Sequence, residues 1–437
     1  MSEKLTVLFL PESAYGPTNQ CIGLADVLVK RGHRVVFASE SSWAGKLAPL
    51  GFEERLIDLA APDPTASDED AGQFWTDFIA ETAPEFRKST TEQLETFIKP
   101  TYQALIDGAM YAEPTLRQIV DDVRPDVLVE DNVVLFPALA SKDAPFVRIV
   151  SCNPLEVPGE GIAPRLSGLA QDDPAAWRPF REEFERTHKD MWEAFNAWVI
   201  EQGARPLPYL EFMPSDGAAN IYVYPEVADY VGERPLDDSW HRVDSSVRLT
   251  EEQYVIPDQL ADRPDGSGLV YVSLGSLGGA DVDLMQRLVD ALADSRHRFI
   301  VSMGPQADKI RLADNMTGAA MLPQTNVIPQ VDLVISHGGN NTTTEALHFG
   351  KPMVVLPLFW DQYDNAQRMH ELGFGIRLKT YEFTPEQLND AIDALLADAD
   401  LRGRLDQIGA RIRQRDGLRK AAGIIEQIGL THVRAGA

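Results

Sequence analysis

The sequence predicts an α/β protein made of two doubly wound domains, each with a parallel sheet. Residues 5–10 and 34–38 are apolar, strand-like runs, and they flank an amphipathic helical stretch at 17–31. This order is a βαβ unit, the start of a doubly wound sheet. At 269–293 and at 331–350 an apolar run is again followed by a helical stretch, with a glycine turn between them. A chain of 437 residues also exceeds what one ordinary core holds, so two domains are expected.

Composition places the domain boundaries. Residues 1–235 are predicted to form the first domain and residues 267–415 the second. Residues 236–266 are rich in Pro, Asp, Ser and Gly without clear periodicity, so they are predicted to be the linker. Residues 416–437 belong to a final amphipathic helical stretch.

The charge balance excludes several classes of partner. The formal net charge is −27, whereas nucleic acids and anionic membranes are bound by basic patches. Cys21 and Cys152 form no metal-binding spacing, which favours a reduced compartment. No run approaches the ~20 apolar residues of a membrane span, and the N-terminus lacks the features of a signal peptide. We therefore expect a cytoplasmic protein, and the sequence leaves its oligomeric state open.

Residues 334–362 are the most informative stretch of the chain. A strand leads through Gly338 and Gly339 into a short helix that must end before Pro352. A helix that begins after a glycine turn offers free N–H groups and a positive dipole end, which suits an anion such as phosphate. A capping box formed by Thr342 and Glu345 would explain these two residues without any ligand.

Polar residues gather where the predicted strands end. They are His337, Asn341, Gly275 with Ser276, Asp361 with Gln362, and the run Glu130, Asp131, Asn132. The carboxyl ends of strands in open α/β sheets border the ligand crevice. These residues are therefore predicted to line one site.

Residues 331–365 closely resemble the donor-sugar signature of the inverting UDP-glycosyltransferases, a family with the GT-B fold. The positions at the family's spacing are Pro323, Gln324, His337, Gly338, Gly339, Asn341, Thr342, Glu345, Gly350, Lys351, Pro352, Asp361 and Gln362. The resemblance implies two Rossmann-like domains facing across a cleft. The first domain would bind the acceptor, the second would bind the nucleotide sugar, and the last helix would cross back to the first domain.

The resemblance also implies a role for each donor-site residue. Glu345 would hold the ribose hydroxyls, and Leu322 with Gln324 would hold the nucleobase. Gly275, Ser276, His337, Gly339, Asn341 and Thr342 would cradle the diphosphate, and Asp361 with Gln362 would bind the sugar. Met321 stands where many relatives have an aromatic residue that stacks on the base. The expected reaction moves a hexose from a UDP- or dTDP-linked donor with inversion, and needs neither a metal nor another cofactor.

The usual catalytic histidine of the family is replaced by Pro17, and no histidine lies between residues 1 and 32. Its aspartate partner corresponds to Asp131. Three explanations follow: Asp131 or Glu12 acts as the base, the acceptor is an amine or an acidic group that needs little deprotonation, or the protein binds a nucleotide sugar without transferring it. We expect a transferase, with Asp131 as the first candidate and Glu12 as the second. A non-catalytic partner protein is the alternative.

The acceptor region matches the family least. Residues 61–111 and 156–198 are helical in pattern and rich in aromatic residues. Aromatics at helical spacing mainly report burial. In this family the region walls the acceptor pocket, so we expect a hydrophobic small molecule as the acceptor.

Overall fold

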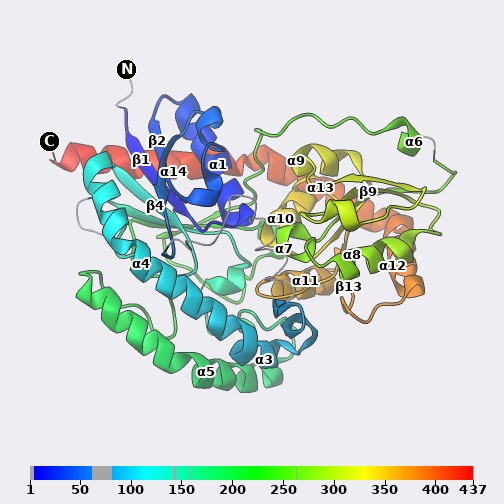
Figure 1. The fold of residues 1–437 in the computed structure, drawn as a ribbon, viewed down its shortest axis with the longest axis horizontal. Helices are drawn as coiled ribbons and strands as arrows, with labels where there is room; N and C mark the ends of the chain where they lie inside the picture. The colour runs from blue at the N-terminus through cyan, green and yellow to red at the C-terminus, as the bar shows by residue number, and fades with distance from the viewer. Residues whose placement is uncertain (1–3, 62–80, 141–143, 158, 262, 437) are drawn as a thin grey trace.

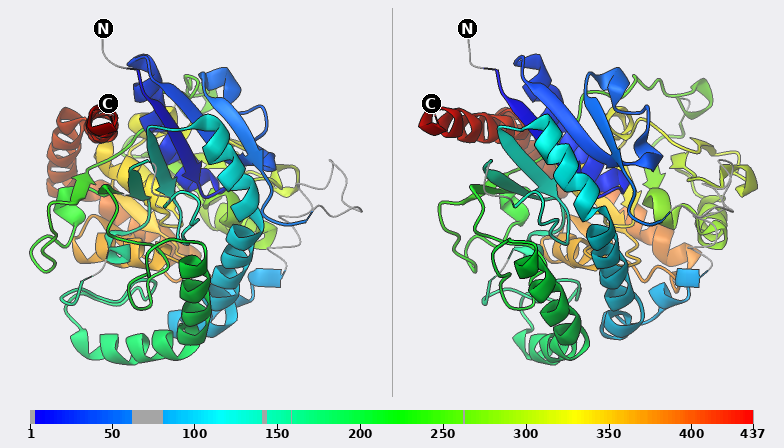
Figure 2. Two further views of the ribbon diagram at one scale, coloured as in Figure 1. Left: turned by 90° about the vertical axis from the view of Figure 1, so that its left-hand side faces the viewer. Right: turned by 60° about the vertical axis from the view of Figure 1, so that its left-hand side comes forward.

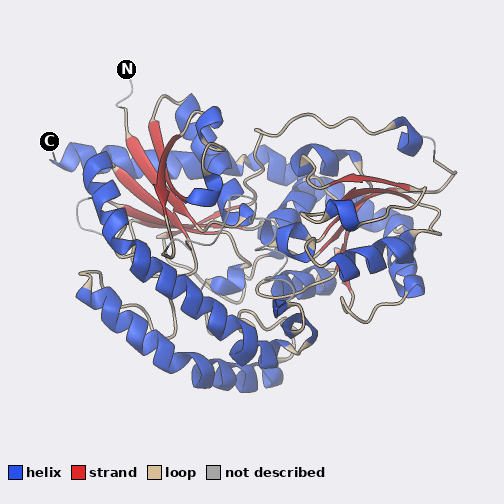
Figure 3. Cartoon of the chain, in the orientation of Figure 1, coloured by secondary structure: helices blue, strands red, loops and turns tan. Residues whose placement is uncertain are grey.

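The computed structural model describes residues 4–61, 81–140, 144–157, 159–261 and 263–436. These residues form two α/β domains, each built around one parallel sheet (Figures 1 and 3). The predicted fold class is confirmed. Residues 62–80, part of the predicted acceptor wall with Phe74, Trp75 and Phe78, lie outside the described residues.

The first sheet has the order β3-β2-β1-β4-β5-β6-β7, and all its pairs are parallel. Its strands are β1 (Thr6–Pro11), β2 (Arg34–Glu40), β3 (Glu53–Ile57), β4 (Val127–Asp131), β5 (Phe146–Val150), β6 (Ala219–Val223) and β7 (Trp240–Val243). β1 and β4 are neighbours, so the chain reverses its direction of winding between them. Ligands of doubly wound sheets bind at such a switch point.

The second sheet has the order β10-β9-β8-β11-β12-β13 and is also fully parallel. Its strands are β8 (Leu269–Ser273), β9 (Arg298–Ser302), β10 (Met316–Ala319), β11 (Leu333–Ser336), β12 (Met353–Val355) and β13 (Gly375–Arg377). Its switch point lies between β8 and β11, and the glycine turns at Gly275 and Gly338 follow these two strands.

Helices cover both faces of the first sheet (Figure 2). α4 packs on one face, and α1 and α14 pack together on the other. The helices of the first domain are α1 (Tyr15–Lys30), α3 (Thr90–Gln93), α4 (Lys99–Val123) and α5 (Pro174–Glu201). The later helices are α6 (Asp258–Ala261), α7 (Gly275–Gly278), α8 (Val282–Leu292), α9 (Gln324–Val327), α10 (Asn340–His348), α11 (Gln362–Glu371), α12 (Pro385–Ala397), α13 (Ala399–Arg415) and α14 (Gly417–Gly436).

The C-terminal helix returns to the first domain. The chain turns at Asp416, which has a positive φ of 45°, and α14 then runs along the first sheet (red in Figure 1). Glu426 of α14 accepts a hydrogen bond from Arg31 at 2.8 Å, and its other oxygen lies 3.1 Å from Nε2 of His33.

The predicted linker at 236–266 was too long. β7 (Trp240–Val243) lies within it and pairs with β6 as the edge strand of the first sheet. The polar composition around this short strand conceals it, since only Val243 in it is fully buried. The segment that joins the two sheets therefore begins after Val243.

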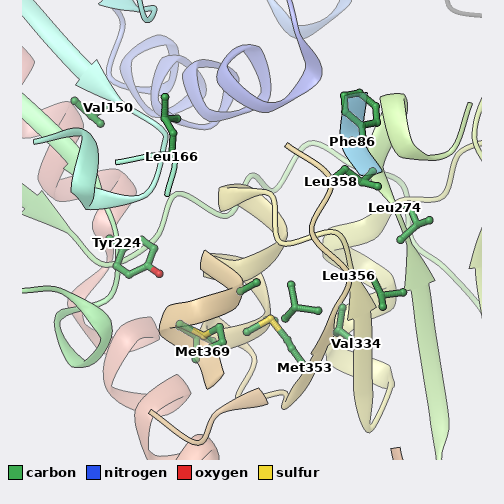
Figure 4. Packing of buried hydrophobic residues seen from close by; sticks show 14 of the residues in the cluster. Phe86, Val150, Leu166, Tyr224, Leu274, Val334, Met353, Leu356, Leu358 and Met369 are labelled. Carbon is green, nitrogen blue, oxygen red and sulfur yellow. The ribbon is translucent and has the colours of Figure 1, made fainter. Parts of the chain in front are cut away.

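The two domains share buried apolar contacts. One hydrophobic cluster contains residues from both, including Phe86 and Leu166 of the first domain and Leu358 and Met369 of the second (Figure 4). Asp364 of α11 also accepts hydrogen bonds from the backbone N–H groups of Leu166 and Gly168, at 2.6 and 2.8 Å. The two domains are therefore in direct contact at α11. No helix among the described residues has the length and apolar character needed to cross a membrane.

Candidate active site

The two switch points face each other across the cleft. The start of α10, after β11, meets the start of α1, after β1. Asn341 donates a hydrogen bond from Nδ2 to the carbonyl oxygen of Gly16 at 2.8 Å, which joins the two helix starts directly. A residue predicted for the donor, Asn341, is therefore in direct contact with the start of α1.

The predicted diphosphate cradle is formed by two glycine turns and a histidine between them. A Cβ on Gly275 would lie 2.7 Å from Cε1 of His337, and a Cβ on Gly339 would lie 2.5 Å from Nε2. Gly275 also has a φ of +71°, which side chains rarely adopt. Position 275 therefore favours glycine on two grounds, a side chain at Gly339 would displace the His337 ring, and that ring lies against the two turns.

His337 is a neutral hydrogen-bonding group in this arrangement. Burial lowers the pKa of His337 to about 4, so the ring is uncharged at pH 7. Its Nδ1 is buried and has no hydrogen-bond partner among the described residues. A neutral imidazole carries one N–H, and the backbone of Ser273 is a hydrogen-bond partner of the ring that would compete with a phosphate oxygen for it.

α10 begins at Asn340, two residues before Thr342, and Gly339 is its N-cap. No side chain caps this helix, so the capping box considered for Thr342 and Glu345 does not form. The first N–H groups of the helix remain without side-chain partners, which leaves the positive end of the helix for an anion. Ser276 lies in the turn after β8 and is half-buried.

Gln324 brings the residues predicted for the nucleoside together. Its Nε2 donates to Oε2 of Glu345 at 2.5 Å and to Oγ1 of Thr342 at 3.2 Å. Its Oε1 accepts a hydrogen bond from the Tyr271 hydroxyl at 3.1 Å. Arg248 donates to Oε1 of Glu345 at 2.9 Å. The Glu345 carboxylate is thereby held on both oxygens.

Met321 and Leu322 precede this cluster in the chain. Met321 is 65% exposed, and Leu322 is half-buried. The Met321 side chain therefore presents free apolar surface, which can pack on a base without the ring–ring geometry of an aromatic residue.

The residues predicted for the sugar are engaged in protein contacts. Asp361 accepts a hydrogen bond from the backbone N–H of Asn153 at 2.9 Å and another from Nδ2 of Asn365 at 3.3 Å. Burial raises the pKa of Asp361 to about 7. Gln362 accepts hydrogen bonds on Oε1 from the N–H groups of Leu358 and Phe359, so its amide orientation is fixed by the preceding loop.

The loop between β12 and α11 reaches the aromatic wall of the first domain. Phe359 stacks on Phe86 with ring centroids 4.9 Å apart, and Trp360 lies 5.0 Å from Tyr102. Trp360 has a φ of 55°, an uncommon conformation for a bulky residue. The donor side and the acceptor side therefore meet at this loop.

Asp131 ends β4 and is 3% exposed. Its Oδ1 accepts a hydrogen bond from Ser151 at 2.9 Å, and the Cys21 thiol of α1 lies 4.0 Å from Oδ2. Burial raises the pKa of Asp131 to about 8, so the carboxyl is largely protonated at pH 7. Pro17 lies one turn before Cys21 and is the third residue of α1, where its missing N–H removes no helical hydrogen bond.

Glu12 follows β1, and its N–H donates to the carbonyl oxygen of Asp131 at 2.8 Å. Its side chain is half-buried and lines a cavity of about 50 Å³ together with Glu40, Asn132, Leu105 and other mostly apolar groups. Burial, and to a smaller extent the Glu40 carboxylate, raise the pKa of Glu12 to about 7. A cavity of this size admits the reacting end of an acceptor, whereas whole drug-sized ligands need ~300–1,000 Å³.

Known glycosyltransferases resemble this chain over most of its length. A sequence profile described as Erythromycin biosynthesis protein CIII-like, C-terminal domain, matches residues 286–414. The chain is 27% identical over 417 residues to the NDP-glycosyltransferase YjiC of Bacillus subtilis (strain 168), covering 94% of both chains. It is 27% identical over 427 residues to the demethyllactenocin mycarosyltransferase of Streptomyces fradiae, covering 96% of this chain and 86% of the relative. The chain is a glycosyltransferase with the GT-B fold.

Solved structures of other glycosyltransferases share the fold. The glycotransferase of kitacinnamycin superposes with a TM-score of 0.71 at 21% identity, covering 98% of this chain and 99% of that one. The glycosyltransferase VinC in complex with dTDP superposes with a TM-score of 0.63 at 19% identity, covering 98% of this chain and all (100%) of that one. The arrangement of two facing Rossmann-like domains is therefore common to these chains.

Several residues at the site of this glycosyltransferase were not predicted from the sequence. Arg248 lies in the segment predicted as linker, and Glu40 ends a strand with no motif around it. Asn153 reaches the site through contacts with Asp361 and Asn365, which lie more than 200 positions away. One signal was available: Glu40 follows the predicted strand at 34–38 by two residues, at the edge of the sheet where ligands bind.

Proposed function

We propose that this glycosyltransferase moves a hexose from a UDP- or dTDP-linked donor to a hydrophobic small-molecule acceptor, with inversion at the anomeric carbon. The observation that carries the proposal is the uncapped start of α10, which lies beside the Gly275 turn and His337. A leaving diphosphate develops negative charge, and preorganised N–H groups at a helix start stabilise it without a metal ion.

The donor site divides into three parts in this proposal. Gly275, Ser276, His337, Gly339, Asn341 and Thr342 receive the diphosphate. Glu345 accepts hydrogen bonds from ribose hydroxyls, while Leu322 and Gln324 contact the base beside Met321. Asp361 and Gln362 receive the sugar hydroxyls. To bind the sugar, Asp361 gives up the hydrogen bond that it accepts from the Asn153 N–H. The similar glycosyltransferase VinC, whose structure is a complex with dTDP, supports a nucleotide diphosphate as part of the donor.

We propose Glu12 as the general base. Its carboxylate lines the cavity beside β1 and β4, whereas Asp131 lies behind that edge with Ser151 and Cys21 on its oxygens. A base works best with a pKa near the operating pH, and the pKa of Glu12 is about 7. Glu12 thus serves as the base in place of the histidine that Pro17 replaces. Asp131 is a neutral neighbour whose backbone carbonyl accepts a hydrogen bond from the Glu12 N–H.

The proposed reaction is a single displacement. The acceptor nucleophile attacks the anomeric carbon from the side of the first domain, and its proton passes to the Glu12 carboxylate. The bond from the anomeric carbon to the diphosphate oxygen breaks on the opposite face, and the electron pair remains on the diphosphate at the start of α10. Attack opposite the leaving group inverts the anomeric centre.

Nucleotide release tests the proposal. UDP-glucose and dTDP-glucose are incubated with a panel of phenolic, alcoholic and amine acceptors, and UDP or dTDP is measured together with the glycosylated product. Glu12→Gln should lose ~10²–10⁴-fold in kcat for a hydroxyl acceptor, since that is the usual contribution of a general base. Asp131→Asn should retain most of the activity. The reverse order of losses would assign the base to Asp131.

Two other outcomes change the assignment. If Glu12→Gln and Asp131→Asn both keep wild-type activity with an amine acceptor, the acceptor needs no base. Tight binding of nucleotide sugar without product on any acceptor would support a non-catalytic partner protein, the alternative that Pro17 raises.

A further inference from the structure

Arg248 is a buried cation in the segment that joins the two sheets. It is 8% exposed, and its guanidinium forms ion pairs with Glu345 of α10 at 2.9 Å and with Glu251 in its own segment. Charged side chains are rarely buried unless they are paired, and the two carboxylates supply the pairing that Arg248 needs.

Glu345 depends on this contact for its charge. The residue is 4% exposed, and burial raises the pKa of its carboxyl, which the Arg248 guanidinium opposes. An ionised carboxylate is an acceptor only, whereas a protonated carboxyl donates with one oxygen. Arg248 therefore favours the form of Glu345 that accepts hydrogen bonds from hydroxyl groups.

Glu251 fixes the other side of the guanidinium. Its Oε2 accepts hydrogen bonds from the N–H and from Oγ1 of Thr325 at 2.7 and 2.8 Å, and its carbonyl accepts one from Asn326 at 3.2 Å. Thr325 and Asn326 belong to α9, which begins with Gln324. Arg248 and Glu251 thus connect α9 to α10, the two helices that carry the predicted nucleoside contacts.

The same segment is held against the first domain. Ser246 donates a hydrogen bond to Oε1 of Gln20 at 2.6 Å, and a Cβ on Gly23 would lie 3.6 Å from Cβ of Arg248. Both Gln20 and Gly23 belong to α1. The position of Arg248 is therefore set by contacts to both domains.

We propose that Arg248 is a positioning residue for the donor: it holds the Glu345 carboxylate ionised and oriented so that Glu345 accepts hydrogen bonds from the ribose hydroxyls. This inference rests on the proposed function, because it assigns the ribose to Glu345. It adds a residue from the interdomain segment to a nucleoside site otherwise built from the second domain.

The test compares nucleotides that differ only in the ribose hydroxyls. Binding of UDP and dTDP, and of their analogues without 2′- and 3′-hydroxyls, is measured by calorimetry or by competition. Arg248→Met should weaken UDP by roughly 10- to 100-fold, the range for lost hydrogen bonds to a charged group. It should not weaken the analogue without ribose hydroxyls. Arg248→Lys should restore part of the loss, since it keeps the charge but not the forked geometry.

Two controls isolate the effect. Arg263→Met removes another arginine of the interdomain segment, one paired with Asp332 and 35% exposed in its side chain, and should change neither ligand. In a Glu345→Gln background, Arg248→Met should cause no further loss for UDP, because the group it positions is gone. Thermal unfolding of each variant reports its folding separately.

Three results would overturn the inference. An equal loss for UDP and for its hydroxyl-free analogue would indicate a general structural role, and so would an additive loss in the Glu345→Gln background. Unchanged UDP binding by Arg248→Met would exclude any role. If the wild-type protein binds neither UDP nor dTDP, the proposed function fails together with the inference, whereas the first three results leave the proposed function intact.

Discussion

Glu12 and Glu40 line one cavity, and their repulsion bears on catalysis. Burial, and then Glu40, raise the pKa of Glu12 to about 7, so its ionised fraction rises with pH through that value. With Glu12 as the base, kcat/KM should rise as pH increases and level off above about 7. Glu40→Gln removes a negative neighbour and lowers the pKa of Glu12. The rise should then shift to lower pH, with higher relative activity at pH 6.

The control for this prediction is Asp58→Asn. It removes the same charge from a nearby exposed position, which does not contribute to the shift of Glu12. The pH–rate profile of Asp58→Asn should match the wild type. A profile of Glu40→Gln that coincides with the wild type would exclude this pair from the reaction.

Asp131 links folding to pH. Its pKa is about 8 in the folded protein, against ~3.9 for an unperturbed aspartate. Between these values the folded state holds a proton that the unfolded state has lost, so stability falls as pH rises. Asp131→Asn removes this dependence, and its stability relative to the wild type should increase from pH 5 to pH 8. Urea unfolding at both pH values measures the change.

An exposed aspartate provides the comparison for Asp131. Asp121 lies at the surface of α4, and Asp121→Asn should keep a constant difference from the wild type at pH 5 and pH 8. If Asp131→Asn behaved in the same way, Asp131 would be ionised in the folded protein and could compete with Glu12 as the base.

Gly275 combines two requirements that can be separated by mutation. Its φ of +71° strains any side chain, and an added Cβ would also press on His337. Gly45 has a φ of +75° with nothing within 4 Å of an added Cβ. Gly45→Ala should therefore cost only the backbone strain, about 1–2 kcal/mol in the free energy of unfolding. Gly275→Ala should cause a similar loss of stability and should also weaken nucleotide binding, which calorimetry with UDP measures. If both variants bind UDP with equal affinity, His337 does not contribute to diphosphate binding.

At the scale of elements, α10 shows what the sequence predicts and what it does not. Gly338, Gly339 and the polar residues after them predicted a helix start at a strand end, and the structure has one. The helix starts at Asn340, directly after the extended Gly339, whereas Thr342 and Glu345 hydrogen-bond to Gln324 and Arg248 and do not form a capping box. Local patterns therefore predicted the element, whereas the side-chain partners of Thr342 and Glu345 lie far away in the chain.

β7 and Arg248 show the limit of such patterns. β7 is a short edge strand with three half-buried residues, so it lacks the alternation that identifies a strand. Arg248 is paired with Glu345 across 97 positions, and nothing in its neighbours signals that contact. Both lie within residues 236–266, where composition alone predicted a linker. The donor motif could be predicted because its residues are close in sequence, whereas the contacts between domains could not.

At the scale of the whole molecule, α14 makes the first domain depend on the end of the chain. Ile425 is fully buried against the face of the first sheet that also carries α1. A Cβ on Gly429 would lie 2.7 Å from Val127 of β4, so the helix and the strand are in close contact. Ile425→Ala should cost about 2–5 kcal/mol in the free energy of unfolding, as for other buried large-to-small changes. Gln427→Ala, at an exposed position of the same helix, should be nearly neutral.

Hydrogen exchange shows which of the two domains loses stability in Ile425→Ala. Because α14 contacts α1, β4 and β7, Ile425→Ala should increase hydrogen exchange in the first sheet and in α1. β8 and β11 belong to the other sheet and should keep their protection. Hydrogen-exchange mass spectrometry resolves these segments. Increased exchange confined to the second domain would mean that α14 stabilises α13 and its own domain, and that the first domain is stable without it.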